Sequence, residues 1–219
     1  MSEPYEYETT EELPVRFPIF PLPGTLLFPR SLLPLNIFEP RYLNMLDDIR
    51  AGDGLIGMVQ SFATGPKTHP DIADVGCLGQ LASFTETEDG RYIIALKGLA
   101  RFRIAEELPL DRPYREVRAD YTEFEHDFLP PDTESLPPRD VVFSALMDYL
   151  ERRGLEANLD ASDDAPLEMI INALCAACPF SVIEKQALLV APDLETRCNT
   201  LLALLEMGSD DGGESPFLN

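Results

Sequence analysis

The sequence contains little positive charge: 17 Lys and Arg side chains oppose 39 Asp and Glu, which gives a formal net charge of −22. Nucleic acids and anionic membrane surfaces are bound through clustered Lys and Arg, because these side chains neutralise the charge of phosphate groups. A chain as acidic as this one would mostly repel both. We therefore expect neither nucleic acid nor a membrane among its partners.

Long apolar runs are also missing, and no stretch reaches the roughly 18 residues that indicate a membrane-spanning helix. Residues 1–12 hold five Glu and no Lys or Arg, which is the opposite of the basic start of a secretory signal. The four cysteines are too few to form a disulfide framework in 219 residues. These absences predict a cytoplasmic protein whose cysteines remain thiols.

Motifs of catalysis are not visible either: the sequence has neither a G-x-x-x-x-G-K-[ST] phosphate loop nor the pattern of a catalytic triad. Cys175 and Cys178 form a C-x-x-C at the C-terminal end of an apolar helical pattern, where the helix dipole disfavours a thiolate, so we interpret them as core residues. Ser181 and Lys185 are interpreted as a helix N-cap and an exposed helix charge rather than a Ser–Lys dyad. We expect no catalytic residue, cofactor or metal.

Residues 13–126 are predicted to be β-rich. At their start, prolines at positions 14, 18, 21, 23, 29, 34 and 40 interrupt the apolar runs, which predicts short strands with bends or edges rather than the central strands of a parallel sheet. Gly98 lies inside a later apolar run and indicates a bulge or a close approach of backbone. One helix is expected from Pro40 to just before Gly52. The expected strands are Val15–Phe20, Leu32–Ile37, Leu55–Phe62, Gly76–Glu86, Tyr92–Ile104 and Tyr114–Phe124.

Prolines then mark a predicted linker at residues 127–137, and the pattern of residues 138–206 is helical. Ser181 and Glu184 predict a capping box at the start of one helix, and Asp193 predicts the N-cap of the last. The ends of the chain, 1–12 and 207–219, are acidic and polar and are expected to be disordered. The sequence thus predicts an α+β protein with a β-rich subdomain followed by a helical bundle.

Three separated segments resemble one family in the right order. They are FPIFPLPGTLLFPRSLLPLNIFEPRYLNMLDDI, DVGCLGQLASFTETEDGRYIIALKGLARFRI and FSVIEKQALLVAPDLETRCNTLLALLE. Together they are similar to the N-terminal, substrate-binding domain of the ATP-dependent protease Lon, over roughly Leu13 to Glu206. The resemblance implies a PUA-like β pseudobarrel of about six strands with one helix, followed by a C-terminal helical bundle. We expect a stand-alone Lon N-domain rather than a protease.

Candidate binding residues come from the proline-broken segment, because such a stretch cannot bury every apolar side chain in regular strands and leaves some to line a groove for peptides. An alternative interpretation is that all of them belong to the core. Glu39 and Arg41 match the family pattern; Arg41 is a candidate for binding a carboxylate, although an Arg here more often ties helix to sheet. The apolar candidates are Phe28, Leu32, Leu33, Phe38 and Tyr42.

The resemblance implies a non-catalytic module that recognises exposed apolar segments of unfolded or flexible polypeptides, as an adaptor or chaperone-like factor. Lon or another protease is a further expected partner. Two alternatives remain open on the sequence: a hydrolase with an unrecognised site, and an RNA-binding protein with a PUA-like fold. The net charge of −22 disfavours the second alternative.

Overall fold

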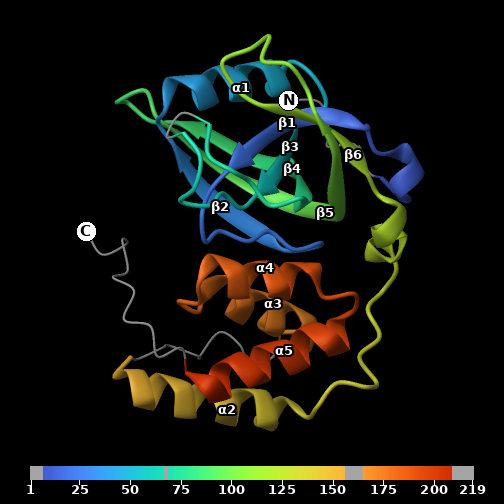
Figure 1. Cartoon of the computed structure of the whole chain (residues 1–219), viewed down its shortest axis with the longest axis vertical. Coiled ribbons are helices and arrows are strands. Elements are labelled where there is room, and N and C mark those ends of the chain that lie inside the picture. Colours follow the sequence, from blue (N-terminus) through green and yellow to red (C-terminus); the bar gives the residue numbers. More distant parts are fainter. Residues whose placement is uncertain (1–6, 67–68, 156–164, 209–219) are drawn as a thin grey trace. The chain divides into compact units, whose positions relative to one another are not determined.

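The computed structural model describes residues 7–66, 69–155 and 165–208, and the chain divides into two compact units, Met1–Pro130 and Pro131–Asn219 (Figure 1). Residues 1–6 and 209–219, for which disorder is predicted, lie outside the described residues. Within the described ranges, no helix is long and apolar enough to cross a membrane. The cytoplasmic location stays a prediction.

The first unit is a mixed sheet of six strands with one α-helix, which confirms the predicted α+β class. The strand order is β2-β5-β4-β3-β1-β6, and a further pairing of β5 with β6 closes β5, β4, β3, β1 and β6 into a ring, so that β2 remains an edge strand beside β5. β1 runs parallel to β3, and the other pairs are antiparallel. The elements are β1 (Arg16–Pro21), β2 (Leu32–Ile37), α1 (Pro40–Arg50), β3 (Leu55–Val59), β4 (Val75–Glu86), β5 (Tyr92–Glu107) and β6 (Glu116–Asp120).

Two short 3-10 helices differ from the sequence predictions. The last predicted strand ends early at Asp120, because its carboxylate accepts hydrogen bonds from the Thr122 N–H at 2.9 Å and the Thr122 hydroxyl at 2.7 Å. The chain then turns into η2 (Thr122–Phe128), which reaches into the predicted linker. Likewise η1 (Thr10–Glu12) lies in the predicted disordered arm, where the Glu12 carboxylate accepts the Glu8 N–H at 2.8 Å.

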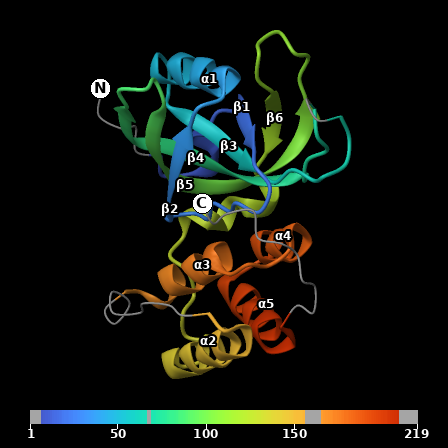
Figure 2. The ribbon, with the colours of Figure 1, turned by 90° about the vertical axis from the view of Figure 1, so that its left-hand side faces the viewer.

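Two apolar clusters form the core of this unit. One fills the ring of strands with residues such as Phe17 and Phe102, whose rings meet edge to face at 4.9 Å. The other lies between α1 and the sheet, and it includes Met45, Leu46 and Ile49 from the helix. Figures 1 and 2 show α1 lying across one side of the sheet, so the helix covers the strand face that would otherwise expose apolar side chains.

Gly98 holds the connection between β1 and β2 against β5. The Gly98 N–H donates to the Ser31 oxygen at 2.9 Å, and the Arg30 N–H donates to the Gly98 oxygen at 2.8 Å. A Cβ on Gly98 would lie 2.0 Å from the main-chain oxygen of Phe28. The register of β4 and β5 also shifts between Leu78 and Gly79, beside this position. Both features predicted for Gly98, a bulge and a close backbone approach, are therefore confirmed.

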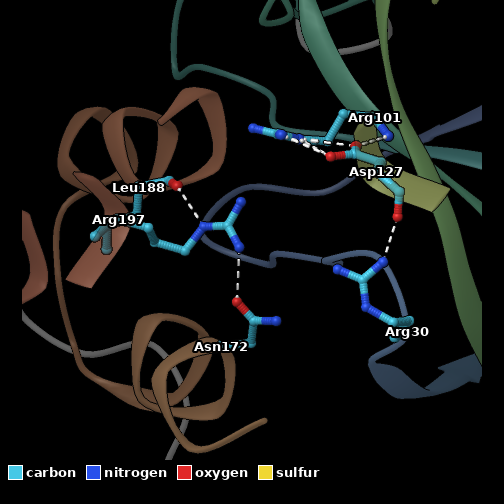
Figure 3. A network of polar contacts seen from close by, with 6 residues as sticks. All are labelled: Arg30, Arg101, Asp127, Asn172, Leu188 and Arg197. Carbon is cyan, nitrogen blue, oxygen red and sulfur yellow. Dashed lines mark hydrogen bonds and ion pairs between the residues drawn. The ribbon is translucent and has the colours of Figure 1, made fainter. Parts of the chain in front are cut away.

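A buried ion pair attaches η2 to β5 (Figure 3). The Arg101 guanidinium donates to both carboxylate oxygens of Asp127, from Nη2 at 2.6 Å and from Nε at 2.9 Å, and the Arg101 N–H donates at 2.8 Å. Both side chains are less than a tenth exposed. Arg30 donates to the main-chain oxygen of Asp127, so one residue joins β5, η2 and the β1–β2 connection. The first residues of the predicted linker, 127 and 128, thus belong to η2.

The described residues of the second unit form four helices: α2 (Arg139–Arg153), α3 (Leu167–Ala177), α4 (Val182–Val190) and α5 (Leu194–Met207). α5 contacts each of the other three (Figure 2). Arg197 of α5 is buried and donates to the Leu188 oxygen at 3.2 Å and to the Asn172 side chain at 2.9 Å (Figure 3). A buried guanidinium thus joins α5 to α4 and α3.

The sequence interpretation of this unit is correct at the caps and cysteines and wrong at Lys185. Ser181 and Glu184 form the predicted capping box, and Asp193 accepts the Thr196 N–H at 2.7 Å. Burial raises the pKa of Cys175 to about 12 and that of Cys178 to about 11, as expected for unreactive core thiols. Lys185 is buried rather than exposed, because its Nζ donates to the Ala176 oxygen at 2.8 Å near the end of α3.

The first prediction concerns Gly98. We expect Gly98→Ala to lower the free energy of unfolding by about 1–3 kcal/mol or more, because the new methyl group overlaps a backbone oxygen that cannot move aside easily. Gly52→Ala is the matched control, since its Cβ would meet no atom closer than 3.8 Å. Urea unfolding followed by circular dichroism measures both variants. Equal stability of the two would contradict the close approach.

The second prediction concerns the buried ion pair. We expect Asp127→Ala to cost about 3–5 kcal/mol, because Arg101 keeps its buried charge without this carboxylate. Glu123→Ala is the control, since Glu123 also pairs with an arginine of β5, Arg103, but the two side chains are 55% and 38% exposed. An exposed pair contributes about 1 kcal/mol or less. Hydrogen exchange of the β5 amides should therefore accelerate strongly in the first variant and little in the second.

Candidate functional site

Two of the five apolar candidates lie on an exposed face of the sheet. The register pairs Leu32 with Lys97 and Asn36 with Ile93, so alternation places residues 32, 34 and 36 on the same face as residues 93, 95 and 97. Leu32 is 66% exposed and Ile93 is 50% exposed. Phe38, just after β2, is 63% exposed. We call this surface the outer β2–β5 face; its members are Leu32, Pro34, Phe38 and Ile93.

The other three candidates belong to the core. Phe28 is 1% exposed, which excludes it from direct contact with a ligand on the surface of this structure. Leu33 packs partly buried against the cluster beneath α1. Tyr42 is 4% exposed and its ring lies 4.2 Å from that of Phe20. Alternation explains the division, since a strand that shows Leu32 to solvent must turn Leu33 inward.

A pocket of about 380 Å³ lies on the same unit, beside the N-terminus of α1. It contains both residues of the sequence motif, Glu39 and Arg41, together with the inner edge of Tyr42. Arg41 Nη2 lies 3.0 Å from a Glu39 carboxylate oxygen, and its guanidinium lies over the Tyr42 ring at 4.5 Å. The pocket is completed by residues of three other segments: Pro21, Leu22, Pro23, Ser61, His69, Pro70, Leu110, Arg112, Pro113, Tyr114 and Arg115.

Arg115 fixes one wall of this pocket. Its guanidinium binds both carboxylate oxygens of Glu107, at 2.7 Å from Nε and 2.6 Å from Nη2, and Nη1 donates to the Pro70 oxygen at 2.7 Å. His69 Nε2 lies 3.2 Å from the same carboxylate. The arrangement joins β5, β6 and the segment before β4, and it uses every nitrogen of the guanidinium. Arg115 is therefore a structural residue of the pocket.

Two further lining residues, Arg112 and Tyr114, form a hydrogen-bonded group with Asp48 of α1. The Tyr114 hydroxyl donates to Asp48 at 2.6 Å, and Arg112 Nη1 contacts Asp48 at 2.5 Å and the hydroxyl at 2.8 Å. The hydrogen bond from Tyr114 lowers the pKa of Asp48. Burial, and then the bond to Asp48, raises the pKa of Tyr114 to about 12. At neutral pH the hydroxyl stays protonated and the carboxylate charged.

The chemistry of these groups is that of binding. Each carboxylate named above faces a guanidinium, and no group of three or more His, Cys, Asp and Glu suited to a metal ion occurs among the residues that the structure describes. What the unit offers is an exposed surface that carries Leu32, Phe38 and Ile93 together with the polar Asn36 and Lys97, and a pocket lined by arginine, proline and leucine side chains. Both suit the capture of a polypeptide.

Comparison with known proteins identifies the family of the chain. A family model described as the ATP-dependent protease La (LON) substrate-binding domain matches residues 16–207. The chain therefore belongs to the LON substrate-binding domain family. The Lon protease of Flavobacterium johnsoniae is 27% identical over 95% of this chain and 27% of its own length. Lon protease 2 of Myxococcus xanthus is 26% identical over 89% of this chain and 24% of its own length. The chain thus spans about a quarter of the length of these curated relatives.

Solved structures show the same fold. The Lon N-terminal domain protein from Xanthomonas campestris matches with a TM-score of 0.57 and 24% identity, over 86% of this chain and 97% of that chain. The N-terminal domain of the Mycobacterium avium complex Lon protease matches with a TM-score of 0.57 and 14% identity, over 87% of this chain and 98% of that chain. At these identities the likeness establishes the fold alone.

The sequence did not predict the contribution of the β5–β6 connection to this LON substrate-binding domain. Arg112, Tyr114 and Arg115 were missed because they lie far along the chain from Glu39 and Arg41. A signal is present, since two arginines and a tyrosine flank Pro113 in one short turn of an acidic protein. Ile93 was missed for a different reason: its exposure follows from the register with β2, which the sequence does not specify.

The third prediction concerns Tyr114→Phe. Removal of the hydroxyl should raise the pKa of Asp48 part of the way to its ordinary value, while Arg112 still lowers it. Because the pKa of Asp48 is depressed in the folded protein, its stabilising effect is present above the unfolded pKa and is lost as the pH falls through the folded value. The variant should therefore lose less stability on acidification than the wild type.

Carbon NMR of the side-chain carboxyl groups measures the effect on Asp48 directly. Asp89 is an internal control, because its pKa is lowered mainly by the Thr87 hydroxyl in a separate hairpin turn and should not change. An Asp48 that titrates identically in the wild type and in Tyr114→Phe would show that the phenol does not control this wall of the pocket.

Proposed function

We propose that this LON substrate-binding domain is a non-catalytic module that binds exposed apolar segments of unfolded or flexible polypeptides. Membership of a substrate-binding family supports the class of function. The observation that carries the proposal is the outer β2–β5 face, where Leu32, Phe38 and Ile93 are each at least half exposed. Large apolar side chains gathered on one surface mark sites of protein interaction more often than isolated ones do.

The size of this face suits an extended peptide. A strand rises about 3.3 Å per residue, so Leu32 and Phe38 are separated by roughly 20 Å along β2. A segment of about six residues in extended conformation spans that distance. Full burial of one large apolar side chain contributes about 1.5–3 kcal/mol. Two or three such contacts, reduced by the cost of ordering a flexible ligand, correspond to affinities in the micromolar range.

Recognition on this face would occur through side chains rather than through addition of a strand. β2 is the edge strand of the sheet, but Pro34 in its middle has no N–H to donate. A peptide strand along this edge would therefore meet a gap in the hydrogen-bonding ladder, as in many edge strands protected against aggregation. Contacts of side chains with Leu32 and Phe38 do not depend on that ladder.

Charge should select among apolar clients. With a net charge of −22, the chain attracts peptides that carry Lys or Arg beside their apolar residues and repels acidic ones. Salt would screen this attraction and leave the apolar contribution in place, so it should weaken binding modestly. Nucleic acid, with its high density of negative charge, is disfavoured as a ligand.

We also propose that the module acts as an adaptor or chaperone-like factor, and that a Lon protease or another protease is a second class of partner. The named relatives are Lon proteases, of which this chain matches about a quarter. A polypeptide bound transiently with micromolar affinity is released readily, as transfer to a protease requires.

The fourth prediction tests binding by the outer β2–β5 face. Fluorescently labelled unfolded casein and an apolar peptide with basic flanks are titrated with the wild type, Leu32→Ser and Phe38→Ser. We expect micromolar binding by the wild type and a loss of roughly tenfold in each variant, equivalent to about 1.4 kcal/mol. Casein should remain intact on gels throughout, since the proposed module does not cleave it.

Val15→Ser is the matched control, because Val15 is 51% exposed but does not belong to the outer β2–β5 face. Circular dichroism verifies that all three variants are folded. The proposal is wrong if the wild type binds neither probe at high micromolar concentration. It is also wrong if Leu32→Ser and Phe38→Ser bind as well as Val15→Ser does.

A further inference from the structure

The pocket beside α1 contains a guanidinium whose hydrogen bonding is incomplete. Whereas Arg115 uses all three of its nitrogens, Arg41 contacts Glu39 through Nη2 alone at 3.0 Å. Arg41 Nε is buried and has no hydrogen-bond partner among the described residues. A buried donor without an acceptor is unfavourable. An acceptor that reached the planar Nε–Nη2 edge of Arg41 would satisfy this donor.

A second guanidinium, that of Arg112, also lines the pocket. The bonds from Arg112 to Asp48 and to the Tyr114 hydroxyl both use Nη1, so its Nε and Nη2 edge remains for a further acceptor. The lining also includes apolar side chains, among them Leu22 and Leu110. The volume of about 380 Å³ is near the lower end for ligand pockets, which fits one amino-acid residue better than a large cofactor.

We propose that this pocket binds the C-terminal residue of an apolar polypeptide, with the terminal carboxylate on Arg41 and the side chain against Leu22 and Leu110. A planar carboxylate matches the two parallel N–H donors of a guanidinium edge. The C-terminal residue carries this carboxylate and its apolar side chain on the same Cα, so both reach one small cavity together. The inference deepens the proposed function and rests on it.

Charge in the pocket favours a ligand with a single negative charge. Arg112 and Arg115 are already balanced by Asp48 and Glu107, and Glu39 lies beside Arg41. A phosphate with two charges would be repelled by these carboxylates and by the net charge of −22. An Asp or Glu side chain inside a peptide would place a carboxylate on Arg41, but the same residue would have no apolar side chain to contact Leu22 and Leu110.

Glu39 has a defined role in this arrangement: it competes with the ligand. Its carboxylate is the one that Arg41 contacts in the unliganded pocket, and the two side chains are 46% and 36% exposed. An exposed pair joined by one short contact is exchanged easily for a two-bond pair with a ligand. Substitution of the competitor should therefore strengthen binding, whereas substitution of an essential structural residue would weaken it.

The experiment compares two peptides of the same apolar sequence with basic flanks and a terminal leucine, one with a free carboxylate and one amidated. Binding is measured by fluorescence anisotropy with the full chain. We expect the free acid to bind about fivefold tighter or more. Arg41→Gln should abolish that difference, and Glu39→Gln should increase it. Arg16→Gln is the control, because Arg16 also forms an exposed ion pair, with Glu116, but lies outside the pocket.

N-acetyl-leucine serves as a third probe, which separates a peptide terminus from a free small acid. Displacement of the free-acid peptide by millimolar N-acetyl-leucine supports the placement of the terminal residue. Binding of N-acetyl-leucine that needs Arg41, with no preference between the two peptides, would overturn the peptide terminus as the ligand.

The remaining outcomes distinguish this inference from the proposed function. Equal binding of acid and amide by the wild type would overturn the inference and leave the outer β2–β5 face as the binding surface. Binding of neither peptide would overturn the proposed function and the inference with it. A Glu39→Gln variant that is folded and binds the free acid no better than the wild type would overturn the competition by Glu39.

Discussion

The buried ion pair between Arg101 and Asp127 is the contact on which the β-rich unit depends. Asp127 binds the side chain and the main chain of Arg101 in β5, and its own main-chain oxygen accepts a bond from Arg30. It thus joins η2 and β5 to the connection that leads into β2. That connection approaches β5 so closely that only Gly98 fits beside Phe28. The position of the outer β2–β5 face follows from this packing.

Most arginines of the unit serve the structure and not its surface potential. Arg103 lies between Asp74 and Glu123, Arg115 binds Glu107, and Arg112 binds Asp48. Each of these arginines is paired with a carboxylate. Because the chain has 17 Lys and Arg against 39 Asp and Glu, its net charge remains strongly negative. These arginine side chains therefore join segments of the fold, while the net negative charge influences which ligands are attracted. Arg41 differs from these arginines because its Nε is buried and has no hydrogen-bond partner among the described residues.

The fold was largely predictable because its signals are local. Alternation and proline placed β2 at its observed bounds, the Asp-Gly turn placed the β4–β5 hairpin, and Pro40 placed the start of α1. The family motifs indicated that the β-rich subdomain precedes the helical bundle. The end of β6 was predicted wrongly because the Asp120 side chain bonds the Thr122 N–H and ends the strand. Lys185 was predicted to be exposed because lysine usually is, but its Nζ bonds the Ala176 oxygen and the side chain is buried.

The candidate site was predictable only in part. The sequence by itself determined that Leu32 and Phe38 belong to an apolar, proline-broken segment, that Glu39 and Arg41 stand at a strand-to-helix junction, and that the charge is strongly negative. Only the tertiary structure decided that Phe28 and Tyr42 are buried, that Ile93 joins Leu32 on one face, and that Arg112 and Arg41 line the same pocket. The physical reason is that exposure and proximity depend on strand register and on contacts between residues distant in sequence, which no local pattern encodes.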